Sequence, residues 1–193
     1  MQIKKGDDRV VVVFPELGFV LKFPVIRLWI VFRQTILFIW NRDFTSIQKH
    51  WMYPMRAWGG FRGLLFKGLA ANWSEFWFYW QTRNRFLQPT YFSFFGLLNI
   101  QRFGTPCSLK GADLWCQLHE MTNRKVWDDS HHFAEPSNFC LIDGKLRMLD
   151  YGSPASRGVV TLYGEKIFEL FDPSYSWEEE KKKLIAKRGE SAN

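Results

Sequence analysis

The hydrophobic pattern near the start of the chain predicts a β-hairpin. Residues 9 to 14 form a mainly β-branched run, and residues 19 to 23 form a second apolar run. The sequence Pro-Glu-Leu-Gly at residues 15 to 18 separates them and is typical of a turn. Lys22 interrupts the second run, so we expect a lysine held among apolar neighbours on a strand.

Residues 24 to 40 follow as a nearly apolar segment with a helical pattern. The polar residues Arg27, Gln34 and Asn41 recur every seven positions and would form one narrow stripe on a helix. Two arginines interrupt the segment, which argues against a transmembrane span. Two interpretations stay open: a buried helix that covers a sheet, and a helix lying in a membrane interface with its arginines at the headgroups.

Residues 41 to 68 are basic and aromatic and contain several glycines. We expect residues 24 to 71 together to form a helical segment that binds an apolar or anionic surface. Arg56, Arg62 and Lys67 are the side chains expected to supply its positive charge.

Helix and strand signals alternate along the rest of the chain. Asn72 and Glu75 have the spacing of a capping box, which predicts that a helix begins at residue 72 and ends near residue 85. Further expected elements are strands at 90 to 95 and 97 to 103, a helix at 108 to 121, a strand or helix at 159 to 171, and a charged helix at 177 to 187.

A second hairpin is expected at residues 139 to 149. The dipeptide Asp143-Gly144 separates two apolar runs and is a strong signal for a tight hairpin turn. Asn138 precedes the first run and Asp150 follows the second, so the hairpin brings both to the same end of the ribbon. An amide oxygen and a carboxylate are ligands that Mg²⁺ accepts.

This segment resembles the catalytic and metal-binding loops of the protein-kinase-like superfamily, in which H-R-D, four residues, N, a hairpin and D-F-G follow in order. His131 matches the histidine, Asn138 matches the metal-binding asparagine, and Asp150-Tyr151-Gly152 matches the D-F-G motif without a gap. The resemblance implies that the chain binds ATP and holds Mg²⁺ through Asn138 and Asp150.

Phe133 departs from the family pattern, because it occupies the place of the catalytic aspartate. Phenylalanine cannot accept a proton, so phosphotransfer is expected to be slow and to rise in a Phe133→Asp variant. His131 and Asp129 are the catalytic candidates, and Asp128 and His132 are further groups in the same loop.

The resemblance also assigns roles to residues of an N-terminal lobe. Lys22 corresponds to the strand lysine that pairs with phosphate, and Glu75 to the helix glutamate that forms an ion pair with it. Gln101 and Phe103 fall in the stretch that would contact adenine. One glycine, Gly6, precedes the hairpin, so the usual glycine-rich phosphate loop is missing or much reduced.

The fold expected from this resemblance is α+β, with two kinase-like lobes. The N-lobe is predicted at residues 1 to 104, with a helical insertion at 24 to 71, and a shortened C-lobe at 105 to 193. Residues 153 to 158 are expected to form a loop at the position of an activation segment.

Composition narrows the classes of partner. The 193-residue chain has a formal net charge of +7, with ten Trp and 19 Phe, which suits an anionic partner and an interface with lipid or protein. No specific nucleic-acid motif is present. The three cysteines have no metal-binding spacing, which is typical of free thiols in a reducing compartment. We therefore expect a cytoplasmic protein, with peripheral attachment to a membrane as a further expectation.

Three functions follow as hypotheses. The first is a small phosphotransferase that acts on a sugar or glycolipid, as in the bacterial kinases of lipopolysaccharide core that the chain resembles. The second is an inactive pseudokinase that serves as a scaffold or regulator through a protein partner. The third is a membrane-surface interaction module without a nucleotide.

Overall fold

The computed structural model describes residues 1–55 and 59–190, and it is an α+β protein with two antiparallel sheets. The chain divides into two compact units. The first contains residues 1–81 and 89–103, and the second contains residues 82–88 and 104–193. The sequence placed the boundary at residue 104, and the structure differs by assigning residues 82–88 to the second unit.

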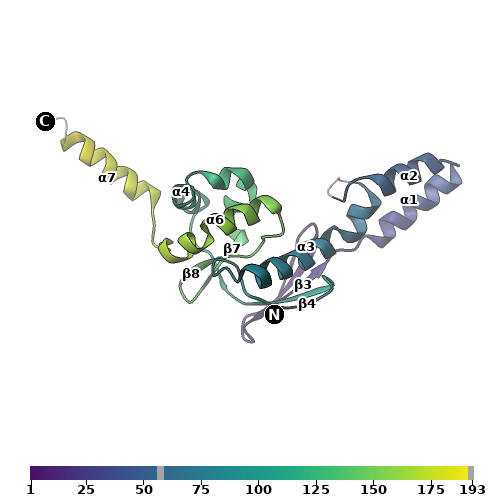
Figure 1. Cartoon of the computed structure of the whole chain (residues 1–193), viewed down its shortest axis with the longest axis horizontal. Helices are drawn as coiled ribbons and strands as arrows, with labels where there is room; N and C mark the ends of the chain where they lie inside the picture. The colour runs from purple at the N-terminus through teal and green to yellow at the C-terminus, as the bar shows by residue number, and fades with distance from the viewer. Residues whose placement is uncertain (56–58, 191–193) are drawn as a thin grey trace. The chain divides into compact units, whose positions relative to one another are not determined.

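The first unit is built on a five-stranded sheet (Figure 1). The strand order is β1-β2-β3-β5-β4, and every neighbouring pair is antiparallel. The expected hairpin and the two later strands are confirmed with boundaries shifted by one residue at most. The strands are β1 Gln2–Lys5, β2 Arg9–Phe14, β3 Phe19–Pro24, β4 Thr90–Phe94 and β5 Leu98–Arg102.

Helix α3, Phe61–Thr82, lies along this sheet (Figure 1). Its buried residues recur at the helical period and form one stripe: Phe61, Leu65, Gly68, Asn72 and Glu75. The predicted capping box at residue 72 is therefore wrong, because Asn72 lies in the middle of a continuous helix. The full length of this helix was not predicted, because one glycine and two polar residues interrupt the apolar pattern of its buried stripe.

Two further helices of the first unit, α1 Leu28–Trp40 and α2 Phe44–Met52, lie side by side (Figure 1). Within α1, Val31 is the only buried residue among those described, and it packs with Phe61 and Leu65. The interpretation of residues 24 to 40 as a buried helix is therefore wrong. We call α1 and α2 together the apolar arm, since many large apolar side chains of these helices are exposed: Leu28, Trp29, Ile30, Phe32, Ile36, Leu37, Ile39, Trp40, Phe44, Trp51 and Met52.

The second unit has a three-stranded sheet in the order β6-β7-β8. The expected hairpin is confirmed: Phe139 pairs with Met148, and the turn residues Asp143 and Gly144 have positive φ angles of 53° and 73°, as an Asp-Gly turn requires. Residues 82–88 run beside the hairpin, where the backbone amide of Met148 donates to Phe86 O at 2.8 Å. The strands are β6 Thr105–Pro106, β7 Phe139–Ile142 and β8 Lys145–Met148.

Helices surround the hairpin in the second unit, and their core includes Leu114, Phe133, Tyr151 and Ile167. Ser153 caps α6 by accepting from Ser156 N, so the loop expected at residues 153 to 158 is instead the start of a helix. The helices are α4 Gly111–Met121, α5 Ser130–Phe133, α6 Pro154–Leu170 and α7 Trp177–Glu190, with 3₁₀ turns η1 Lys125–Asp129 and η2 Pro136–Asn138.

Candidate functional site

A buried ion pair joins the sheet of the first unit to α3. Lys22 Nζ lies 3.2 Å from Glu75 Oε2, and Glu75 is completely buried. The predicted pairing of Lys22 with Glu75 is confirmed, whereas a role for either residue in nucleotide binding stays a prediction. Sequence reasoning missed Arg9, whose guanidinium binds the other oxygen of Glu75. The β2–β3 register would have revealed it, since Arg9 lies opposite Pro24 and Val11 opposite Lys22, which places both cations on one face.

Amide side chains hold the same region of α3 against the sheet. Asn72 donates to Lys22 O at 3.3 Å and to Gly96 O at 3.0 Å, and Asn99 donates to Asn72 O at 2.7 Å. Gly96 has a positive φ of 77°, and a Cβ atom there would collide with the backbone of Leu69. This close approach of sheet and helix fixes the spacing across which Lys22 and Glu75 meet.

The adenine contacts expected at Gln101 and Phe103 are not supported. Strand β5 lies between β3 and β4, so Gln101 is flanked by Val20 on one side and Thr90 on the other. Its side chain is completely buried and donates to Thr90 Oγ1 at 2.8 Å. The backbone amide of Phe103 donates to Gly18 O at 2.9 Å and is not free for a base.

Asn138 and Asp150 lie at one end of the β7–β8 hairpin, as predicted. Leu149 N donates to Asn138 O at 2.8 Å, which holds the two chain segments together at that point. The side-chain amide of Asn138 donates to His132 O at 3.0 Å and thereby fixes which atom of the amide is the oxygen. The pair therefore offers one amide oxygen and one carboxylate, a hard donor set that suits Mg²⁺.

Asp129 is held by three side chains of the second unit. Its Oδ2 accepts from Ser153 Oγ at 2.6 Å and from Ser156 Oγ, while its Oδ1 lies 2.7 Å from His132 Nδ1. Burial alone would raise the pKa of Asp129, but the hydrogen bonds from the serines and His132 outweigh it and hold this pKa below its usual value. His131 Nδ1 approaches Oδ1 at 3.2 Å. The predicted candidates Asp129 and His131 therefore lie together, and His132, Ser153 and Ser156 join them.

Phe133 is completely buried and packs against Phe139, with ring centroids 6.2 Å apart. The backbone thus turns this position into the core and away from solvent. An aspartate there would place a charge among apolar side chains, so burial reverses the expectation that Phe133→Asp raises turnover.

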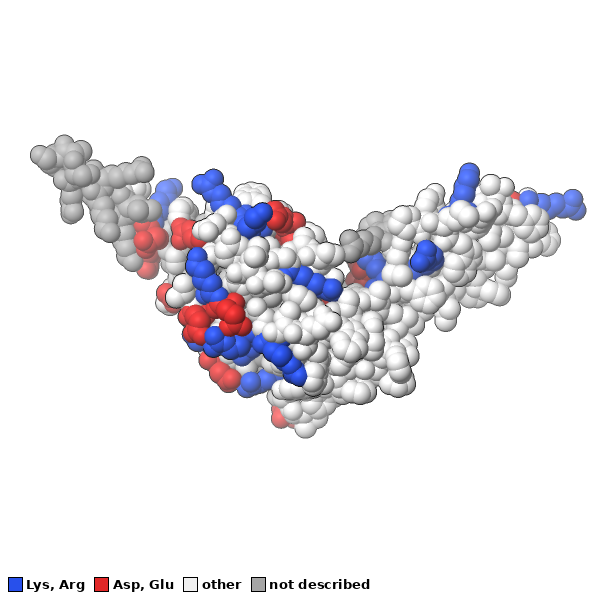
Figure 2. Space-filling view, in the orientation of Figure 1, with Lys and Arg blue, Asp and Glu red and all other residues white. Residues whose placement is uncertain are grey.

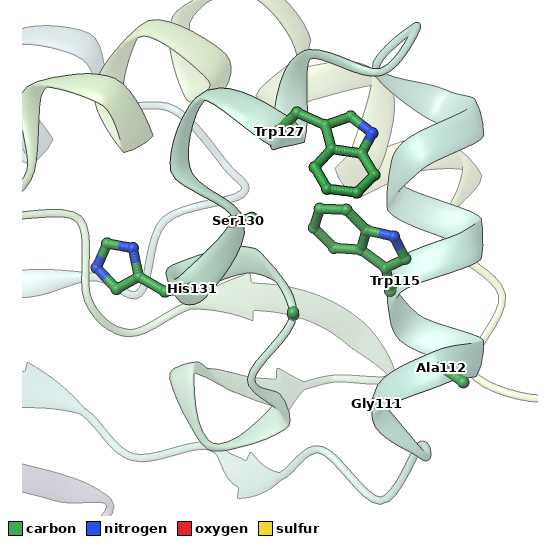
Figure 3. Close-up of a pocket in the computed structure, with 7 residues that line it drawn as sticks. Gly111, Ala112, Trp115, Trp127, Ser130 and His131 are labelled. Carbon is green, nitrogen blue, oxygen red and sulfur yellow. The ribbon is translucent and has the colours of Figure 1, made fainter.

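A pocket of about 460 Å³ lies beside α4 and α5 in the second unit. Trp115 and Trp127 meet edge to face on one side of it, with ring centroids 5.0 Å apart. Figure 3 shows the His131 ring on the other side of α5, pointing away from the two tryptophans. The remaining lining residues are small: Gly111, Ala112, Ser130 and Ala134.

Charged side chains are sparse over the apolar arm. In Figure 2 this part of the surface is mostly uncharged, with isolated basic side chains. Arg33, Arg42 and Lys49 are exposed there, and Asp43 accepts from Ser46 N as the cap of α2. Of the three cations expected to bind an anionic surface, Arg62 is exposed, Lys67 pairs with Asp8 at 2.7 Å, and Arg56 lies outside the described residues.

Among the described residues, no helix combines the length and the apolar character that crossing a bilayer requires. Comparison with protein-family models, with curated proteins and with solved structures found no match to this chain. The functional proposals below rest on the residues of the chain itself.

Proposed function

We propose that this chain is a kinase-like protein that binds a magnesium–nucleotide complex. The observation that carries the proposal is the buried ion pair between Lys22 on β3 and Glu75 on α3. In the superfamily that the sequence resembles, a strand lysine held by a helix glutamate binds the phosphates of ATP.

The physical cost of this pair supports a functional role. Removing a lysine and a glutamate from water costs several kcal/mol per ion, and apolar residues of similar volume often stabilise a core better. A second cation, Arg9, joins the same carboxylate. Ionisable groups placed at such cost are found preferentially at functional sites.

Asn138 and Asp150 are the residues that would hold magnesium in this proposal. The amide of Asn138 is oriented by its bond to His132 O, and Asp150 supplies the negative charge. When bound, the metal would neutralise charge on the nucleotide phosphates. Lys22 would contribute a cation toward phosphate, and Glu75 would orient Lys22.

The loop that contains Phe133 favours nucleotide binding with little phosphotransfer. The buried Phe133 cannot act as a base. We therefore favour a regulatory, pseudokinase-like role over a phosphotransferase. The phosphotransferase alternative, with a sugar or glycolipid acceptor, requires His131 or Asp129 to take the place of the missing base.

Calorimetric titration with Mg-ATP tests the proposal. Lys22→Met and Asp150→Asn should each weaken binding at least about tenfold, because each removes one charge from the proposed contacts. Lys67→Met is the matched control: it removes a lysine from a more exposed ion pair on the same unit and should leave affinity unchanged.

Lys22→Met and Asp150→Asn are titrated as separate variants, because Lys22 belongs to the first unit and Asp150 to the second. Wild-type protein that fails to bind Mg-ATP at millimolar concentration would overturn the proposal. Rapid, Asp129-dependent turnover would favour the phosphotransferase instead.

The exposed apolar arm favours a second function, attachment to an anionic membrane surface. Trp29 and Trp40, near the two ends of α1, are 71% and 83% exposed. Arg33 and Arg42 supply positive charge beside them. A helix with apolar side chains around most of its circumference, with Arg33 near its middle and Arg42 just beyond its end, suits the boundary between headgroups and acyl chains.

Co-sedimentation with liposomes tests this attachment. The double variant Trp29→Ser/Trp40→Ser should partition at least about tenfold more weakly, since burying each indole stabilises the bound state by more than about 1 kcal/mol. Trp127→Ser/Leu162→Ser is the control, because these side chains are 61% and 68% exposed on the second unit. Arg33→Gln/Arg42→Gln should weaken binding to anionic vesicles alone. Equal partitioning of the tryptophan variant and wild type would contradict the proposal.

A further inference from the structure

Two imidazole nitrogens of the second unit lie close to one buried carboxylate oxygen. Asp129 Oδ1 lies 2.7 Å from His132 Nδ1 and 3.2 Å from His131 Nδ1. One ligand atom from each of these residues lies within 4.8 Å of the other two. The imidazole rings of His131 and His132 are 3.9 Å apart between centroids.

We infer that Asp129, His131 and His132 form a binding site for a divalent transition-metal ion such as zinc. In a tetrahedral zinc site the metal–nitrogen and metal–oxygen bonds are about 2.0–2.2 Å, so neighbouring ligand atoms lie about 3.3 Å apart. The 3.2 Å distance is close to this spacing and the 2.7 Å distance is shorter. A small shift of the His132 imidazole would place a metal between the two ring nitrogens and Oδ1.

The surroundings of Asp129 orient its carboxylate for this role. Both serine hydroxyls, from Ser153 and Ser156, bind Oδ2, which leaves Oδ1 directed toward the two imidazoles. Ser153 is itself fixed as the cap of α6, where it accepts from Ser156 N at 3.1 Å. Hydrogen bonds of this kind hold a metal-binding carboxylate in place and raise metal affinity.

The chemistry of the ligands separates this site from the proposed magnesium site. Two imidazoles and one carboxylate favour zinc, cobalt or nickel, whereas Asn138 and Asp150 offer oxygen atoms alone. The His131 side chain is 77% exposed, so a metal has a path from solvent. Three protein ligands would leave a fourth position for water, as in catalytic rather than structural zinc sites.

Cobalt titration of the full chain, followed by visible absorption, tests the inference. Wild-type protein should bind one Co²⁺ with the intense spectrum of a tetrahedral site, and Zn²⁺ but not excess Mg²⁺ should displace it. His131→Ala is the decisive variant, because its exposed side chain can be removed without disturbing the core. It should weaken binding at least about tenfold, as should His132→Ala.

His119→Ala is the matched control and should bind cobalt like wild type, since His119 lies on α4 and packs beside Trp115 and Trp127. Equal cobalt affinity of wild type and His131→Ala would overturn the inference. So would a thiolate-to-cobalt charge-transfer band, which would assign the metal to the cysteines. The inference is independent of nucleotide binding, because metal binding is measured without a nucleotide.

Discussion

Replacing Glu75 with glutamine should strongly destabilise the first unit. Glu75 is completely buried and is the carboxylate that holds both Lys22 and Arg9. At 3.2 Å, with an effective dielectric constant of about 20, the gross attraction between Lys22 and Glu75 is about 5 kcal/mol. Glutamine keeps the shape but removes the charge, so two cations remain together in a nearly buried environment.

Glu75→Gln should therefore lower the free energy of unfolding by roughly 3–5 kcal/mol, the range that is typical of breaking a buried ion pair. Lys22→Met should cost less, about 1–2 kcal/mol, because Arg9 and Glu75 then remain as a neutral pair. The inequality between the two variants is the specific prediction, since it follows from two cations sharing one anion.

Urea unfolding followed by circular dichroism measures both free energies. Hydrogen exchange of α3 peptides locates the loss, which should be concentrated around residues 72 to 75. A cost below about 1 kcal/mol for Glu75→Gln, or an equal cost for Lys22→Met, would refute the reasoning about shared charge. The double variant Lys22→Met/Arg9→Met should lower the free energy of unfolding further than Lys22→Met alone, because it removes both cations that bind the buried Glu75 carboxylate.

Four further predictions concern the second unit. Gly164→Ala should destabilise it by about 1–3 kcal/mol in urea unfolding, since a Cβ atom would lie 2.6 Å from a buried side-chain amide. Gly158→Ala, with open space at the same helix, should stabilise it by about 0.5–1 kcal/mol. Phe133→Asp should cost more than about 3 kcal/mol and leave ATP turnover no faster; a stable, faster variant would contradict its burial. Burial alone would raise the pKa of Glu165, but the hydrogen bonds and charge of Arg85 outweigh burial and lower this pKa. The Arg85–Glu165 pair therefore stabilises the fold above the unfolded-state pKa of Glu165. This stabilisation declines as pH falls through the folded-state pKa. Arg85→Gln should therefore lower the urea midpoint only slightly near neutral pH, because this pair is exposed, and the difference from wild type should shrink toward pH 3.

Local signals predicted the strands and part of the site. Apolar runs and the turn residues between them predicted both hairpins, and the second apolar run located Lys22 on its strand. Glu75 could be paired with Lys22 because the sequence contains no other acidic residue between Asp43 and Asp113. A few neighbouring residues determine the hairpins, whereas the pairing of Lys22 with Glu75 spans 53 positions and came from the family resemblance.

Features that depend on tertiary packing could not be predicted from the sequence. Asn72 resembled a helix cap, yet its amide binds two backbone carbonyls across the sheet, which no local pattern indicates. Ser153 and Pro154 were expected to lie in a loop. Instead α6 begins there: Ser153 is its N-cap and Pro154 lies in its first turn, where proline is favoured. The clustering of His132 and Ser156 at Asp129 joins segments 27 residues apart and required the fold.

Helix α3 has a consequence for how the first unit would respond to its surroundings. One uninterrupted helix carries Leu65, which packs on the apolar arm, and Glu75, which holds Lys22 about 15 Å further along its axis. A rigid helix cannot tilt at one end and stay fixed at the other. If lipid binds the arm, nucleotide binds at Lys22 and α3 couples the two sites, each ligand changes the affinity for the other by the same factor. Coupling that raises both affinities would make the protein respond most strongly where membrane and nucleotide are present together.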